Sequence, residues 1–161
     1  MRDLYVPIAL LALSACATQS AASVPAASIG RTWLDPTIGV RQDVSTALVV
    51  LESYRVALKH GEIHTLLALA SDDYLDGSGT PEADDDVDRT GLAQALSRWN
   101  AIALTDLDLR VTHVARRGET LVLEVRYAIR VRIGGRQSVL SEEHEMVLAP
   151  RGRSWAFLSG M

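Results

Sequence analysis

The sequence lacks the features that several large functional classes require. It has a single cysteine, Cys16, so no intramolecular disulfide bond can form. Its formal net charge is -4, which argues against the basic surface that nucleic acid favours. Aromatic residues make up only 5% of the chain and offer few platforms on which single-stranded bases could stack. We therefore expect no nucleic-acid partner.

The motifs of common catalytic and cofactor-binding families are also missing. The chain has no Gly-x-Ser-x-Gly elbow, no phosphate-binding loop and no dinucleotide fingerprint. His60 and His64 flank Glu62, but a zinc-protease helix needs the glutamate directly after the first histidine. Gly61 also breaks the helix between the two histidines. We therefore predict no metal site and no cofactor.

The segment 72–88 has eight acidic residues and no basic one, with glycine and proline among them. Carboxylates and glycine-rich turns suit calcium, and the EF-hand pattern combines the two. Starting at Asp76, that pattern puts Pro81 where glycine belongs and Val87 where the bidentate glutamate belongs. A solvated acidic loop is the favoured interpretation, and an irregular calcium site is the alternative.

What is present begins with the composition and the N-terminus. A chain of 161 residues with 48% hydrophobic and 22% charged residues fits one globular domain. Arg2 precedes an apolar run, Val6–Ala15, that is too short to span a bilayer.

The end of that run, Leu13-Ser14-Ala15-Cys16, resembles a bacterial lipoprotein signal. The resemblance implies that residues 1–15 are removed and that Cys16 is lipidated. Residues 16–41, rich in Ala and Ser at their start, then form a flexible tether to a folded domain at 42–161. Ala17 carries no retention signal, so the expected location is the outer membrane, facing the periplasm. An ordinary cleaved secretory signal is the alternative.

The folded part begins with helices and ends with strands. Asp43 is the expected N-cap of a first helix that Gly61 ends, followed by helices over 62–70 and 89–101, the last capped by Asp88 or Thr90. Strands are expected over 104–115, 120–133, 137–149 and 154–160, and a loop over 33–40. This order predicts an α+β fold.

The longest pattern is the alternation of apolar and charged residues from Thr120 to Ile133. Gly134-Gly135 follows and can form a two-residue hairpin turn. If no bulge intervenes, Tyr127 faces Glu142 and Val125 faces His144 across the hairpin. We then expect the apolar face to carry Leu140, Met146 and Leu148 together with Glu142 and His144.

Two stretches resemble the NTF2-like (SnoaL-like) domain family. They are Tyr54–Tyr74, similar to that family's opening helices, and Ser154–Met161, similar to its last strand. The resemblance covers about 43–161. It implies a cone of three N-terminal helices packed on a curved antiparallel sheet of about four to six strands, with a pocket at the wide end. The family includes isomerases, dehydratases, cyclases, hydrolases and binding modules.

The expected pocket combines residues from the first helix, the third helix and the strands. The candidates are Tyr54, Trp99, Tyr127, Glu142, His144 and Trp155. Tyr54, Glu142 and His144 are the candidate catalytic groups, because a hydroxyl, a carboxylate and an imidazole can perform acid–base chemistry. The structural alternative is that Tyr54 belongs to the core and that Glu142 and His144 lie at a solvated strand end.

Two functional hypotheses follow. The first is a membrane-anchored binding or accessory module of the cell envelope that takes a small apolar ligand or a partner's side chain. The second is an isomerase, dehydratase or cyclase that uses the three candidate groups. The charged outer sheet face, with Arg126, Arg130 and Arg132, is either a solvated exterior or the surface of a homodimer.

Overall fold

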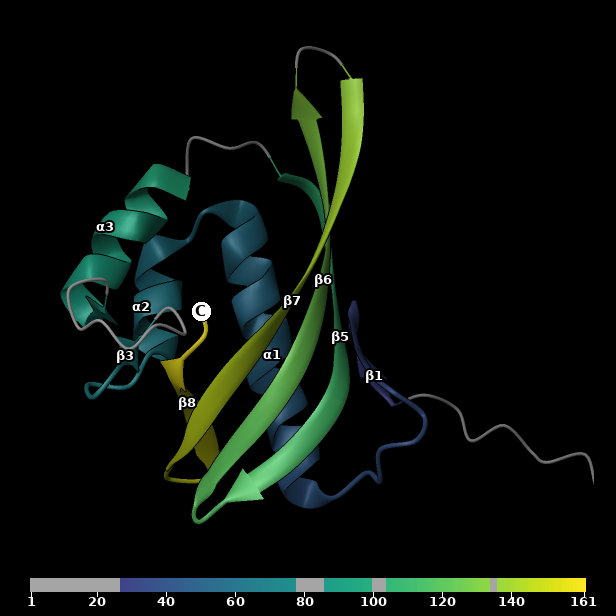
Figure 1. Cartoon of the computed structure of the whole chain (residues 1–161), viewed down its shortest axis with the longest axis vertical. Helices are drawn as coiled ribbons and strands as arrows, with labels where there is room; N and C mark the ends of the chain where they lie inside the picture. Colours follow the sequence, from purple (N-terminus) through teal and green to yellow (C-terminus); the bar gives the residue numbers. More distant parts are fainter. Residues whose placement is uncertain (1–26, 78–85, 100–103, 134–135) are drawn as a thin grey trace, which may run out of the picture.

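The computed structural model describes residues 27–77, 86–99, 104–133 and 136–161. Cys16, most of the expected tether and the Gly134-Gly135 turn lie outside these residues. Three helices pack on a six-stranded sheet, which is the expected α+β cone (Figure 1). The elements are β1 (Ser28–Ile29), β2 (Thr32–Leu34), α1 (Gln42–His60), α2 (Ile63–Leu69), β3 (Leu75–Asp76), β4 (Val87–Asp88), α3 (Arg89–Trp99), β5 (Leu104–Arg117), β6 (Thr120–Ile133), β7 (Arg136–Arg151) and β8 (Ser154–Ser159).

The large sheet has the strand order β1-β2-β5-β6-β7-β8, and β3 pairs with β4 separately. All neighbours in the large sheet are antiparallel except β2 and β5, so the sheet is mixed rather than purely antiparallel. The expected loop at 33–40 therefore begins two residues later, since Trp33 and Leu34 belong to β2. The sheet also starts at Ser28, before the expected domain boundary at residue 42. These strands have two and three residues, too few to show an alternation in the sequence.

Helix α1 packs across the sheet and forms the centre of the core (Figure 1). One stripe of α1 is buried, as its 3.6-residue spacing predicts: Val44, Ala47, Leu48, Leu51 and Tyr54. Gly61 ends the helix with φ +67°, a conformation that glycine adopts without strain. The N-cap is Arg41 rather than Asp43, which lies inside the helix and bonds Arg41 and Val44.

Helices α2 and α3 extend this helical layer. The expected cap of α3 is confirmed, because the Asp88 carboxylate accepts the backbone N–H of Gly91 at 2.8 Å. The helix begins at Arg89, as predicted, and its described part ends at Trp99.

The β6–β7 hairpin has the predicted register. Pairing is continuous from Leu121–Leu148 to Ile133–Arg136, with Tyr127 opposite Glu142 and Val125 opposite His144. The apolar side of β6 is buried, as are Met146 and Leu148 on β7.

The prediction for Leu140 is wrong, because its side chain is 49% exposed. In Figure 1 the far end of the hairpin extends beyond the helices. The exposure of Leu140 fits its position toward that end of β7, beyond His144 and Glu142.

A charged pair joins α1 to strands β2 and β5 of the sheet. Arg55, 7% exposed, bonds Glu52 through two nitrogens at 2.7 and 2.8 Å and donates to the carbonyl of Leu107 at 3.1 Å. Glu52 also accepts the hydroxyl of Thr32 at 2.9 Å. Burial of Glu52 opposes its charged form, but the hydrogen bonds from Arg55 and Thr32 outweigh burial and lower the pKa of the carboxyl.

This arrangement predicts that Glu52→Gln destabilises the fold by about 2–3 kcal/mol at neutral pH, since it leaves a buried guanidinium without its counter-charge. The folded-state pKa of Glu52 lies below the ordinary value of 4.5. The stabilisation is therefore present above that value and is lost as the pH falls through the folded-state pKa. Urea unfolding at several pH values measures both effects. Glu119→Gln, at an exposed turn, is the control. An equal loss of unfolding free energy in Glu52→Gln and Glu119→Gln would contradict the stabilising role of the Glu52–Arg55 pair.

Candidate functional site

A cavity of about 230 Å³ lies between the helices and the inner face of the β6–β7 hairpin. Its described lining consists of Tyr54, Leu58, Asp76, Leu96, Tyr127, Ile129, Glu142, His144, Gly160 and Met161. Five elements contribute: α1, β3, α3, β6 and β7, together with the chain end after β8. The C-terminus accordingly lies between α2 and β7 in Figure 1.

Two buried tyrosines form the deep side of the cavity. Tyr54 and Tyr127 are 3% and 5% exposed, and their rings meet edge to face with centroids 6.5 Å apart at 87°. The hydroxyl of Tyr127 donates to the Tyr54 oxygen at 3.3 Å. Burial raises the pKa of Tyr54 to about 12, and burial also raises the pKa of Tyr127. Both hydroxyls are therefore neutral hydrogen-bonding groups at physiological pH.

The outer side of the cavity carries a histidine and a glutamate from one strand. The Nε2 atom of His144 lies 3.1 Å from a carboxylate oxygen of Glu142, two residues away on the same face of β7. The His144 ring also meets Tyr127 edge to face, at 5.2 Å and 81°. The Glu142 and His144 side chains are 60% and 49% exposed, which places them at the solvent-facing opening.

Asp76 on β3 closes the third side of the cavity. Its carboxylate accepts the backbone N–H of Gly160 at 3.1 Å and the hydroxyl of Tyr74 at 3.4 Å. Gly160 has φ +82°, and a Cβ there would collide with the backbone carbonyl of Glu145. Glycine is therefore required at 160 for the chain end to pass this close to β7.

The candidate residues from the sequence divide into three groups. Tyr54, Tyr127, Glu142 and His144 surround the cavity together. Trp155 is not among the described lining residues, because its indole N–H bonds the carbonyl of Asp43 at 3.1 Å and the hydroxyl of Thr46 at 3.0 Å near the start of α1. The side chain of Trp99 lies outside the described part of the structure.

Sequence reasoning missed six lining residues. Leu58, Leu96 and Ile129 are apolar positions of predicted elements, whereas Asp76 belongs to the predicted acidic loop and Gly160 and Met161 to the predicted last strand. The meeting of the last three depends on β3 lying beside β8, a long-range contact that no local pattern indicates. The calcium alternative falls largely on 78–85, outside the described residues. Among those that are described, no three or more His, Cys, Asp or Glu side chains are grouped to hold a metal ion.

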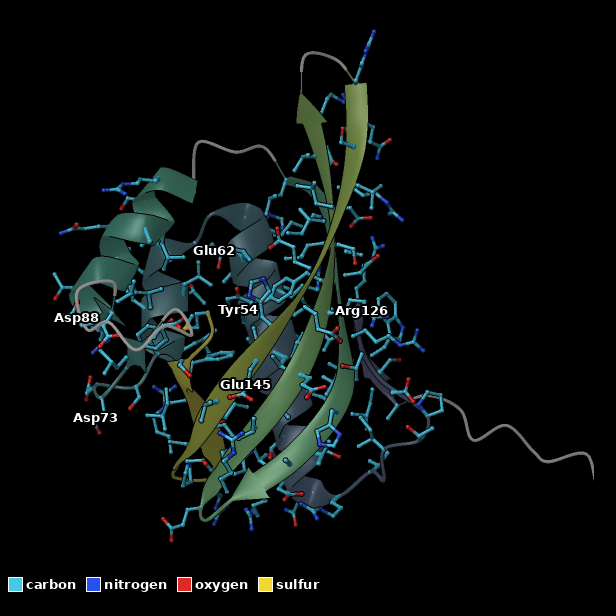
Figure 2. The ribbon with its side chains drawn as sticks, viewed as in Figure 1. Tyr54, Glu62, Asp73, Asp88, Arg126 and Glu145 are labelled. Atoms are coloured by element: carbon cyan, nitrogen blue, oxygen red, sulfur yellow. The ribbon has the colours of Figure 1, made fainter. Side chains whose placement is uncertain are left out.

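The opposite face of the sheet is charged. In Figure 2, Tyr54 lies between α1 and β7, whereas Arg126 extends from the sheet away from the helices. Arg126 lies 3.5 Å from Glu143, its partner across the hairpin, and Arg110 lies 3.8 Å from Asp35. This face holds a second hollow of about 280 Å³, which is more open to solvent, but its arginines, Arg110 and Arg126, already have acidic partners.

The chain has the fold of NTF2-like and ketosteroid-isomerase-like proteins. A ketosteroid-isomerase-like protein from Erwinia carotovora atroseptica superposes with a TM-score of 0.59 over 75% of this chain and 95% of its own, at 13% identity. An NTF2-like protein from Novosphingobium aromaticivorans gives 0.57 over 74% and 79%, at 12% identity. A putative dehydratase of the NTF2-like family from Streptomyces avermitilis gives 0.56 over 73% and 93%, at 16% identity. No protein-family model and no curated protein matches the sequence. At these identities the similarity establishes the fold.

The buried tyrosines predict a protein that loses stability in alkali. Burial raises the pKa values of Tyr54, Tyr74 and Tyr127 above the ordinary value of 10.0, so the unfolded chain ionises first as the pH rises. Above pH 10 the free energy of unfolding should fall by about 1.4 kcal/mol per pH unit for each tyrosine. Urea unfolding between about pH 9 and 11 measures the slope. Tyr127→Phe should reduce it by roughly a third, and a flat profile would contradict the burial of these hydroxyls.

Proposed function

We propose that this protein is a membrane-anchored binding module of the cell envelope, whose cone cavity takes a small molecule or a partner's side chain. The observation that carries the proposal is the cavity itself: apolar walls from Leu58, Leu96 and Ile129, with a few polar groups directed to one space. Small-molecule sites have this composition. At about 230 Å³ the cavity is smaller than the usual range of about 300–1,000 Å³ for drug-sized ligands, so the ligand is small.

The N-terminal sequence supports the anchor. The Leu13-Ser14-Ala15-Cys16 segment matches a lipoprotein signal at all four positions, and lipid chains contribute about 0.8 kcal/mol per buried methylene. A flexible tether over 17–26, ahead of β1, would hold the domain on the order of 20 Å from the lipid. In the described part of the chain, no helix has the length and apolar character to cross a bilayer. We place the protein at the outer membrane, facing the periplasm.

The anchor is tested by Cys16→Ser in the full chain expressed in a Gram-negative host. The wild type should be labelled by a radioactive or clickable fatty acid and should sediment with the membranes. The variant should lose the label and appear in the soluble fraction, because it has no thiol to acylate. Unlabelled wild-type protein, or a labelled variant, would contradict lipidation at Cys16.

The binding site is tested by filling the cavity. Leu58→Trp puts a larger side chain on the lining face of α1, whereas Val49→Trp puts the same side chain on the exposed face of that helix, where Val49 is 52% exposed. Saturation-transfer NMR with a library of small organic molecules should detect ligands of the wild type and of Val49→Trp. Their signals should drop at least fivefold with Leu58→Trp. Equal signals for both variants, or no ligand at all, would contradict the cavity as the site.

An acid–base enzyme is the second candidate function. The specific observation in its favour is that Tyr54, Glu142 and His144 surround one cavity, with the imidazole and the carboxylate in hydrogen-bond contact at 3.1 Å. The same NMR samples separate the two functions. An isomerase or dehydratase converts a bound molecule over time, whereas a binding module leaves it unchanged.

A further inference from the structure

The charges around the cavity are of one sign. The described lining includes two carboxylates, Asp76 and Glu142, and no lysine or arginine. Even with a full positive charge on His144, the formal charge of the lining is -2 + 1 = -1. The chain has 16 lysine and arginine residues, and several of the arginines lie on the other face of the sheet. The described lining of the cavity is therefore acidic rather than basic.

The same cavity is walled by aromatic rings set at steep angles to one another. The Tyr54 and Tyr127 planes meet at 87°, and the Tyr127 and His144 planes at 81°. Tyr54 also packs against Phe157, at 5.3 Å and 52°, and Tyr54, Tyr127 and His144 all line the cavity. The face of a tyrosine ring attracts a cation electrostatically, and this attraction strengthens where water is excluded.

The size of the cavity limits what can enter. A volume of about 230 Å³ corresponds to roughly eight water molecules at ~30 Å³ each. A compact, weakly hydrated cationic head fits this space and suits its apolar walls at Leu96 and Ile129. An anion would be repelled by two carboxylates, and a neutral molecule could donate hydrogen bonds to them but would lack the attraction between opposite charges.

From this combination we propose that the cavity selects a small organic cation, a tertiary or quaternary ammonium group on a short carbon skeleton. The ammonium group would lie against the tyrosine rings with Glu142 and Asp76 as counter-charges. This inference rests on the proposed function, since it names the class of small molecule that the cavity binds.

Three probes of one shape test the role of charge. Choline carries a trimethylammonium head, 3,3-dimethylbutan-1-ol replaces it with a neutral tert-butyl group, and 3,3-dimethylbutanoate is the anionic analogue. We expect choline to bind at least tenfold more tightly than the alcohol, and the carboxylate to show no binding, in NMR titrations of the wild type. Equal affinities of choline and the alcohol, or no binding of choline, would overturn the inference.

Two isosteric variants test the position of the charge. Glu142→Gln removes the carboxylate at the cavity, and Glu143→Gln removes the neighbouring carboxylate on the opposite face of β7. Both side chains are exposed, at 60% and 48%, so neither change endangers folding. Glu142→Gln should lower the affinity for choline at least fivefold and keep the affinity for the alcohol within twofold of the wild type. Glu143→Gln should keep the affinity for choline within twofold of the wild type. An equal loss of choline affinity in the two variants would mean that only the net charge of the protein matters, and it would overturn the inference.

The failure of this inference is distinguishable from failure of the proposed function. The alcohol or a library molecule could bind the wild type and lose affinity in Leu58→Trp while choline binds no more tightly than the alcohol. The cavity would then bind small molecules without selecting cations. If no molecule of either set binds, both proposals are wrong.

Discussion

The continuous pairing of β6 with β7 is the constraint on which the site depends. Side chains alternate across a strand, so a slip or bulge of one residue would move Glu142 and His144 to the outer face and bring Glu143 and Glu145 to the cavity. Bulges do occur elsewhere in this sheet, between Leu104 and Asp106 and between Val111 and His113 on β5. A further register shift lies between Val147 and Leu148, where β7 pairs with β8. The irregularities therefore fall in the pairings with β5 and β8, while the β6–β7 pairing at the cavity keeps its register.

Helix α1 supplies the second half of the site, and its position is fixed by polar as well as apolar contacts. Arg55 reaches from α1 to the backbone of β5, one residue after Tyr54. The two side chains point in different directions. Arg55 holds the helix to β5, and Tyr54 forms the deep side of the cavity. A structural contact and a cavity residue thus share the same helical turn.

The parts of this structure that the sequence predicts are those determined locally. Alternation over Thr120–Ile133 sets which residues share a face, and Gly61 and Asp88 mark helix ends through backbone geometry and capping. The parts that it does not predict arise from distant contacts. Asp76 reaches the cavity because β3 lies beside β8, and Trp155 is directed to the start of α1 by hydrogen bonds to residues more than 100 positions away. The exposure of Leu140 is also not predicted by the sequence, because it depends on how far the helices extend along the hairpin.

The division of polar groups between the deep and the outer parts of the cavity follows from the energetic cost of burying charge. Fully buried positions carry tyrosines, which are neutral and satisfy part of their hydrogen bonding with each other, as Tyr127 does with Tyr54. The carboxylate of Glu142 remains at the opening, where water solvates it without a ligand. A weakly hydrated organic cation entering the cavity would cover that opening and place its positive charge next to the carboxylate. Burial of Glu142 would then be compensated by the ligand, which couples the affinity to the charge of the molecule that binds.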